Sequence, residues 1–389
     1  MILFRFTLLF SNIHSEGVKV LKIDGRLIRK IDFSLIIVVL IICTLGVIMV
    51  GSATYNLSVG SERFIRTQVA SIVLGLISIV FILFFDYNTF ARFHIPIYII
   101  CNALLVAVLV FGTGSEKWGA DRWIRIGGFQ FQPADFVKIG IIICISKMLV
   151  DHKDSLHKLS TLFKIGVYAL VPMVLIVRQP DLGTTLAFAF FTFGMLFIAG
   201  LKYKYIFIAG ITGILSLPLA WLGLKDYQRW RILVFINPEI DPTGKGYHIL
   251  QSKLAVGSGM LFGKGLFKGS QTQYGFLPER QTDFIFSVLA EELGFMGAAG
   301  LLILYGIMLI KCINIAREAK DDFGAYLVTG LTFMLAYHIF ANIAMTIGLM
   351  PVTGKPLPLI SYGGTFMLSN MIALGLILNV NMRRDKINF

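Results

Sequence analysis

Residues 33–52 read FSLIIVVLIICTLGVIMVGS and contain no charged side chain. An apolar run of about 20 residues is long enough to cross the hydrocarbon core of a membrane as a helix. Such runs recur along the chain, which has 389 residues, of which 56% are hydrophobic and 15% are charged. Soluble globular proteins carry roughly 25% charged residues. The sequence therefore predicts an all-α protein that crosses a membrane many times.

Ten membrane-spanning helices are predicted, and they form one domain over residues 33–380. Their approximate limits are 33–52, 66–85, 94–112, 133–150, 163–178, 182–199, 205–223, 284–310, 324–350 and 358–380. Residues 1–32 and 381–389 are the predicted terminal segments. The longest connection, 224–283, joins the seventh and eighth helices and carries too many aromatic residues for a disordered linker. We expect it to fold over one face of the membrane domain.

The net charge of +13 is compatible with nucleic-acid binding, but Lys and Arg mostly flank the apolar runs. They concentrate in alternate connections, as in the segments 26–30 and 383–386. This pattern orients a protein with its basic connections in the cytoplasm, and it also suits anionic lipid headgroups. We therefore expect no nucleic-acid partner and a location in the cytoplasmic membrane. Both termini should be cytoplasmic, and the loop 224–283 should lie outside.

The four cysteines, Cys43, Cys101, Cys144 and Cys312, lie within apolar runs or at the end of one. They form no CxxC pair, and no histidine cluster accompanies them. Neither a disulfide framework nor a zinc site is predicted, and the sequence shows no dedicated set of metal ligands.

Acidic side chains stand where the eighth apolar run begins, in LPERQTDFIFSVLAEELGF at 277–295. Glu279 and Asp283 lie near the start of the predicted helix, where the helix dipole stabilises a carboxylate, and this role alone would explain them. Glu291 and Glu292 would lie about 12–14 Å deeper in a continuous helix. Carboxylates at such depth face the protein interior or a water-filled cavity. They are predicted to pair with Lys or Arg of a neighbouring helix, or to have a gating role inside the bundle.

A second polar segment, FQPADFVK at 131–138, contains Gln132, Asp135 and Lys138. Asp135 and Lys138 are three residues apart and share one face of a helix. An acid and a base that enter a membrane span together are predicted to form an ion pair, which is either structural or lines a cavity.

Two further polar segments interrupt the apolar sequence. RQPDLGT at 178–184, with Gln179 and Asp181, is either a tight turn between two spans or a polar part of a cavity. PVTGKPLPLISYGGT at 351–365, with Ser361, is rich in proline and glycine, and irregular backbone at membrane depth occurs only where it lines a cavity or is buried in protein. The bases of all these segments can hold a diphosphate, and a carboxylate can take up a proton. Such a set suits an anionic, lipid-linked substrate.

Six sequence blocks, in order along the chain, resemble the SEDS family (shape, elongation, division, sporulation) from about Ile31 to Arg384. They are KWGADRWI, FQPADFVK, QPDLGT, NPEIDPTGKGYHILQSKLAVGSG, LPERQTDFIFSVLAEELGF and GLMPVTGKPLPLISYGGT. The fifth block and the preceding GKGLFKGSQTQ are more similar to the RodA branch of the family than to the FtsW branch. The resemblance implies a peptidoglycan glycosyltransferase that polymerises lipid II into β-1,4 glycan strands on the outer face of the cytoplasmic membrane, for cell elongation and shape. It also implies a class B penicillin-binding protein as partner.

The resemblance also implies roles for individual residues. Asp283 corresponds to the family's essential aspartate, and we expect it to act as the general base of an inverting transfer. Asp135 and Lys138 correspond to the family's glutamate–lysine pair, with Asp in place of Glu, and Arg122 corresponds to the arginine of its RW block. Lys138 and Arg122 are expected to stabilise the diphosphate as it leaves. The predicted substrate-binding residues are Lys138, Asp135, Arg122, Trp118, Gln132, Gln179, Asp181, Glu279 and Ser361.

No cofactor is required by the sequence, although a divalent cation, Mg²⁺ or Mn²⁺, that bridges the diphosphate and a carboxylate is compatible with this chemistry. Two other functions remain open. A transporter that flips lipid-linked precursors would also have many spans, but the clustering of polar groups on one face and the lack of a visible inverted repeat disfavour it. A non-catalytic scaffold that recruits a penicillin-binding protein would not need the carboxylates.

Overall fold

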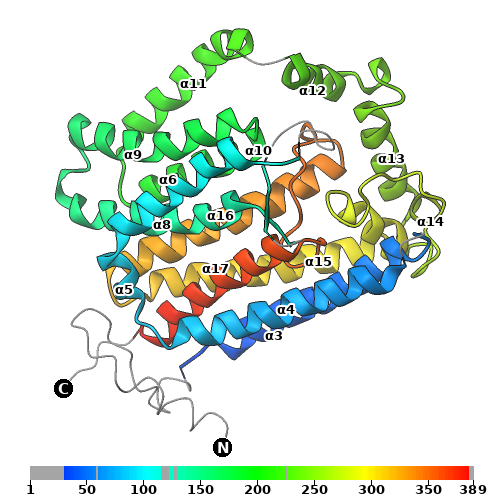
Figure 1. The fold of residues 1–389 in the computed structure, drawn as a ribbon, viewed down its shortest axis with the longest axis horizontal. Coiled ribbons are helices and arrows are strands. Elements are labelled where there is room, and N and C mark those ends of the chain that lie inside the picture. The colour runs from blue at the N-terminus through cyan, green and yellow to red at the C-terminus, as the bar shows by residue number, and fades with distance from the viewer. Residues whose placement is uncertain (1–29, 58–59, 115–121, 127–128, 224–225, 385–389) are drawn as a thin grey trace, which may run out of the picture.

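The computed structural model describes residues 30–57, 60–114, 122–126, 129–223 and 226–384 (Figure 1). Within these ranges the protein is a bundle of helices, which confirms the predicted all-α membrane fold. Each of the ten predicted spans corresponds to one long helix. These helices are α3 (Phe33–Thr54), α4 (Ser61–Leu83), α6 (His94–Phe111), α8 (Pro133–Asp151), α9 (Leu159–Arg178), α10 (Leu182–Ile198), α11 (Tyr203–Gly223), α15 (Ile285–Arg317), α16 (Asp322–Thr346) and α17 (Gly364–Met382).

Seven of the described helices are long and apolar enough to cross a membrane. They are α3, α4, α6, α9, α15, α16 and α17. Helix α10 is apolar but has only 17 residues, and α8 carries Asp135 and Lys138 within its first two turns. The protein is therefore a multi-pass membrane protein, and ten crossings stay a prediction.

Helices α16 and α17 form the centre of the bundle and are the most completely buried of the long apolar helices. Helix α17 packs along α4, whereas α16 packs against α8, α10 and α15. Both helices are buried on nearly all sides, as expected of helices surrounded by other helices. Helices α6 and α9 lie at the periphery and expose most of their apolar side chains.

The long connection 224–283 is folded in its described part. It contains α12 (Asp226–Ile236), a 3₁₀ turn η2 (Pro238–Ile240), α13 (Lys245–Ser258) and the short α14 (Ser270–Gln273). Helix α13 packs on α15 and α16. Figure 1 shows α12, α13 and α14 at the end of the bundle opposite α5 (Tyr87–Arg92), and we call this end the loop end.

Two short elements complete the described fold. The strands β1 (Ile124–Ile126) and β2 (Phe129–Phe131) form an antiparallel pair between α6 and α8, which the sequence analysis did not predict. A 3₁₀ turn, η1 (Lys153–Ser155), follows α8. The β pair leads directly into α8, so it precedes the segment that carries Asp135 and Lys138.

Helix α15 is not the continuous helix that was predicted, because it breaks at Gly294. This residue has φ 66° and ψ −165°, a left-handed conformation that favours glycine. The loop after α13 pairs with the backbone on both sides of the break. The carbonyls of Met260 and Leu261 accept hydrogen bonds from the amides of Phe295 and Met296 (2.8 and 3.1 Å). Backbone groups freed by the break are therefore satisfied inside the protein, as a membrane environment requires.

The break also changes the position of Glu291 and Glu292. Lys311 pairs with Asp32 at one end of α3 (3.2 Å), and Ser52 near the other end donates to Glu292 (2.5 Å). Asp32 and Ser52 are about 30 Å apart along α3 at 1.5 Å per residue, so α15 crosses the full length of α3 after the break. The two glutamates therefore lie at the loop end of this span, and the prediction that they lie deep within it was wrong.

We expect Gly294→Ala to destabilise the protein strongly. An added Cβ would overlap the backbone nitrogen of Gly263 and lie 2.6 Å from the carbonyl oxygen of Leu261, and the positive φ alone costs about 1–3 kcal/mol for a residue with a side chain. Gly300→Ala, later in the same helix, meets no atom within 4 Å and serves as the control. Thermal unfolding in detergent measures both variants, and equal melting temperatures would contradict the role given to the break.

Candidate active site

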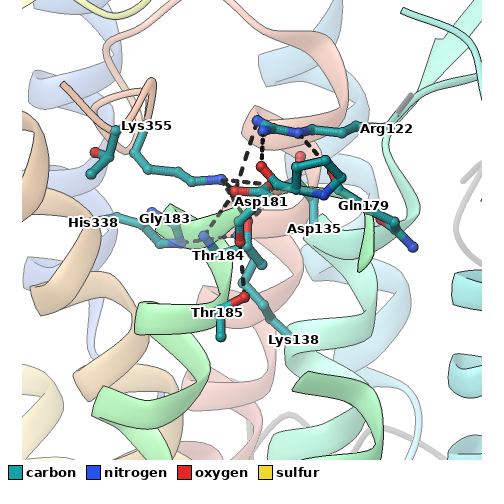
Figure 2. Close-up of polar contacts among 12 residues, drawn as sticks. Arg122, Asp135, Lys138, Gln179, Asp181, Gly183, Thr184, Thr185, His338 and Lys355 are labelled. Carbon is teal, nitrogen blue, oxygen red and sulfur yellow. Dashed lines mark hydrogen bonds and ion pairs between the residues drawn. The ribbon is translucent and has the colours of Figure 1, made fainter. Parts of the chain in front are cut away.

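A buried group of charges lies at the start of α10, where the turn 178–184 ends. Asp181 caps α10 by accepting hydrogen bonds from the amide and the hydroxyl of Thr184 (3.0 and 2.8 Å). Lys355 reaches the same carboxylate from the loop between α16 and α17 (2.8 Å), and it also donates to the Thr184 hydroxyl (2.5 Å). Asp181 is 1% exposed and Lys355 is 5% exposed. The turn is thus part of a buried ionic site, as Figure 2 shows.

Arg122 joins this group from the segment before β1. Its guanidinium lies 3.9 Å from Asp181 and donates hydrogen bonds to the backbone carbonyls of Gln179 and Pro180. Burial alone would raise the pKa of Asp181, but the charges of Lys355 and Arg122 hold this pKa well below its usual value. Asp181 therefore stays ionised, and two cations share one carboxylate.

The second ion pair joins Asp135 to Lys138, as the spacing of these two residues predicts. Lys138 Nζ lies 3.0 Å from Asp135 and 2.9 Å from Nε2 of His338 on α16, and all three side chains are buried. Because a protonated lysine only donates, His338 accepts at Nε2 and holds its proton at Nδ1. Nδ1 of His338 and Oδ2 of Asp135 have no hydrogen-bond partner among the described residues. Buried polar atoms normally have a hydrogen-bond partner, so these two atoms are candidates to bind water or a polar group of a substrate.

Asp283 is fixed beside this group by its backbone. Asn342 of α16 donates one hydrogen bond to the carbonyl of Asp283 (2.8 Å) and another to the carbonyl of Lys355 (2.7 Å). Ser361 donates to the carbonyl of Thr282 (2.6 Å). The irregular segment 351–363, predicted from its prolines and glycines, therefore buttresses the aspartate, and for this reason α17 begins at Gly364 instead of near 358.

The Asp283 carboxylate itself remains half-buried and is not held by the contacts that fix its backbone. A Cβ on Gly354 would lie 3.3 Å from its Oδ2, so the glycine leaves room beside the acid. Burial raises the pKa of Asp283 to about 6, and the negative charge of Glu279 adds to this rise. Lys355, Arg231 and Arg122 act in the opposite direction. Asp283 is therefore poised to exchange a proton near neutral pH.

The remaining predicted residues take different positions. Gln179 is buried and donates to the carbonyl of Leu105 (2.9 Å), so its side chain supports α6 and points away from the ions. Gln132 is half-buried at the start of α8 and makes no capping hydrogen bond. Glu279 is exposed and accepts from the Thr282 hydroxyl (3.3 Å). Trp118 lies outside the described residues.

Three residues of the site were missed by the sequence analysis, namely Lys355, His338 and Asn342. Lys355 is the only cation in the segment 351–365, and His338 is the only Asp, Glu, His, Lys or Arg between Asp322 and Lys355. Ionisable residues at membrane depth are functional candidates by default, so that signal was available for both. Among the described residues, no three His, Cys, Asp or Glu side chains come together to hold a metal ion.

Comparisons with known proteins agree with this architecture. Residues 33–386 match the FtsW/RodA/SpoVE family model, described as a cell cycle protein. The peptidoglycan glycosyltransferase MrdB of Escherichia coli K12 is 38% identical over 82% of this chain and 86% of its own length. Stage V sporulation protein E of Bacillus subtilis is 36% identical over 90% of this chain and 96% of its own length.

Solved structures show the same similarity. A chain from a study of polymerization and crosslinking by a peptidoglycan synthase complex superposes with a TM-score of 0.79 at 30% identity, covering 92% of this chain and 99% of that one. The rod shape determining protein RodA of Thermus thermophilus superposes with a TM-score of 0.69 at 28% identity, covering 92% and 98%. The chain belongs to the FtsW/RodA/SpoVE family, the SEDS family that its sequence blocks predict.

Proposed function

We propose that this protein is a peptidoglycan glycosyltransferase that polymerises lipid II into β-1,4 glycan strands for cell elongation and shape. The observation that carries the proposal is the position of Asp283, a half-buried carboxylate whose backbone is tied through Asn342 to a buried cationic group. The family membership supports it, since the relatives MrdB and FtsW are named peptidoglycan glycosyltransferases.

The chemistry needs one base and a site for a leaving diphosphate. A sugar hydroxyl attacks the anomeric carbon of the donor, and the bond from that carbon to the diphosphate oxygen breaks. Asp283 accepts the proton of the attacking hydroxyl, a contribution of typically about 10²–10⁴-fold in rate. Because a single displacement inverts the anomeric centre, an α-linked donor becomes a β-linked product. The undecaprenyl diphosphate leaves with the electron pair.

The cations beside Asp283 suit the charge that develops on the diphosphate. Arg122 keeps 16% of its side chain exposed and presents a planar guanidinium, which can bind phosphate oxygens in pairs. Lys355 and Lys138 are buried deeper and add positive potential to the site. A divalent cation, Mg²⁺ or Mn²⁺, held by the diphosphate of the substrate would supply further charge neutralisation.

The setting of the reaction is part of the proposal. The distribution of Lys and Arg favours cytoplasmic termini in the cytoplasmic membrane, which would place the loop end outside. The similarity to a chain from a peptidoglycan synthase complex supports a class B penicillin-binding protein as partner.

Reconstitution with lipid II tests the proposal against its two rivals. The purified protein, alone and with a class B penicillin-binding protein, should convert labelled lipid II into long glycan strands. Movement of lipid II across vesicle membranes without polymer would favour a transporter. A scaffold would be favoured if polymer formed only when another polymerase was added, and if replacing Asp283 did not change the amount of polymer.

The rate of polymerisation should depend on pH through Asp283. Burial raises the pKa of this carboxyl to about 6, so the base is ionised above that value and the rate should fall by about tenfold per unit well below it. Glu279→Gln removes the negative charge that helps to raise the pKa, and the acidic limb should then move to lower pH. Initial rates between pH 5 and 8 locate the acidic limb of the wild type and that of Glu279→Gln. A wild-type rate that is flat down to pH 5 would contradict a base with a pKa of about 6 at this position.

A further inference from the structure

Glu291 and Glu292 are both 0% exposed, and the proposed chemistry uses neither of them. The Glu291 carboxylate accepts hydrogen bonds from the amides of Gln271 and Thr272 (2.8 and 3.1 Å) and from the Thr272 hydroxyl (2.8 Å). Lys264 completes its surroundings with an ion pair of 2.9 Å. A side chain of α15 thus holds the start of α14, which lies about twenty residues earlier in the chain.

The chain then runs from α14 directly to the proposed base. Arg280, which is buried, donates to the carbonyl of Thr272, and the amide of Leu277 donates to the carbonyl of Gln271 (3.2 Å). Three residues after Arg280 comes Asp283, and the helix that follows it returns to Glu291. The chain therefore leaves α14, passes Asp283 and comes back to α14 at Glu291. The hydrogen bonds between the Glu291 carboxylate and residues 271–272 close this loop.

We propose that Glu291 is a positioning residue, which holds the segment 270–283 so that Asp283 meets the sugar hydroxyl in one orientation. The inference rests on the proposed role of Asp283 as base. A carboxylate is suited to this task because five donors converge on it, the fifth being the Ser270 hydroxyl at 3.4 Å, and a charge strengthens each hydrogen bond. A small displacement of a base from its reacting atom is enough to reduce a rate severely, by about 10²-fold for 1 Å.

Glu292 offers a matched control in the adjacent position. It is equally buried, but it accepts from Ser52 of α3 (2.5 Å) and from the side chain of Gln273 (3.3 Å) instead of the backbone of residues 271–272. Glu291→Gln and Glu292→Gln therefore remove the same charge from the same helix. Only Glu291→Gln weakens the hold on the backbone of residues 271–272, whereas Glu292→Gln affects the segment 270–283 through the side chain of Gln273 alone.

The pH profile separates positioning from stability. The charged groups that face Asp283 are Glu279 on its own segment, Lys355 on the loop before α17, Arg231 on α12 and Arg122 before β1. Burial is the largest cause of the raised pKa of Asp283. A loosened segment admits water and lowers this pKa, so the acidic limb of the rate should move to lower pH.

For Glu291→Gln we expect kcat to fall by at least about tenfold, with KM for lipid II changed less than about twofold. The acidic limb should move down, and the amides of residues 270–283 should exchange hydrogen faster. Glu292→Gln should leave the limb and the exchange of residues 271–272 unchanged. If Glu291→Gln loosens the segment but keeps kcat and the limb, Glu291 is only structural and the inference falls. If the amides of residues 270–283 do not exchange faster in Glu291→Gln, Glu291 does not hold this segment and the inference is wrong.

Lys264→Gln keeps the test decisive should Glu291→Gln fail to fold. It leaves the carboxylate in place and removes one of its donors from a position that is 29% exposed, so it should cause the same changes to a smaller extent. An unchanged kcat and limb would count against the inference. Asp283→Asn, assayed beside these variants, isolates the proposed function: if it still polymerises lipid II, the base is wrong whatever the Glu291 variants show.

Discussion

Asp283→Asn should lower the rate of glycan polymerisation by about 10²–10⁴-fold, the usual contribution of a general base. The amide has nearly the same volume as the carboxyl but cannot take up the proton of the attacking hydroxyl. The contact with Asn342 uses the backbone carbonyl of residue 283, which the substitution keeps. We therefore expect an unchanged melting temperature and unchanged binding of lipid II. Time courses of strand length from labelled lipid II measure the loss.

Two further variants make this result interpretable. Asp283→Glu keeps the charge but moves the carboxylate by about one methylene, so it should retain part of the activity. Glu239→Gln removes an exposed acid from η2 at the same end of the molecule, and it should retain wild-type activity. A polymerisation rate for Asp283→Asn within about threefold of wild type would show that the proton goes elsewhere, since a true base contributes far more.

The helices could be predicted from the sequence because hydropathy dominates the choice of structure in a membrane. Each apolar run became one helix, and apart from the break at Gly294 the errors in these helices lie at their ends, as with α15, which continues to Arg317 instead of 310. The ion pair of Asp135 and Lys138 was predictable for a similar reason. Two residues three positions apart on a helix meet whatever the rest of the chain does.

The rest of the site depends on contacts between distant parts of the chain. Lys355 meets Asp181 across 174 residues, and Lys138 meets His338 across 200. Hydropathy gives no information about which helix faces which, so neither contact could be predicted from one sequence. The break at Gly294 was hidden as well, because glycine in an apolar run is compatible with an unbroken membrane helix. Its left-handed backbone follows from pairing with residues 260–265, whose position only the folded structure shows.

Asp181→Asn should cause the largest loss of stability in the site. It removes the carboxylate shared by two cations, so Lys355 stays almost fully buried without its ion-pair partner while Arg122 loses its nearest acid. Breaking a buried pair in this way costs about 3–5 kcal/mol. The cap of α10 is largely kept, since asparagine is also a good N-cap residue. Unfolding in detergent, by heat or denaturant, measures the loss.

Replacing the other partner of the ion pair, in Lys355→Met, should cost less stability because Arg122 remains near the Asp181 carboxylate at 3.9 Å. The double variant Asp181→Asn/Lys355→Met should recover most of the stability lost in Asp181→Asn, because replacing the lysine removes the buried charge that the single variant leaves unpaired. Glu62→Gln breaks a pair whose side chains are 79% and 81% exposed, and it should change stability little. Equal losses from Asp181→Asn and Glu62→Gln would show that the buried charges are hydrated.

Lys355→Met should also change catalysis, in a direction that no loss of stability can imitate. The positive charge of Lys355 opposes the rise in the pKa of Asp283 that burial causes. Without that charge the pKa should rise above its value of about 6, so the base is protonated over a wider range and the acidic limb of the rate moves to higher pH. Glu279→Gln and Glu291→Gln are expected to move the same limb to lower pH. Opposite shifts from substitutions on different sides of one carboxyl would identify Asp283 as the titrating base, whereas a common direction would mean that the limb reports another group.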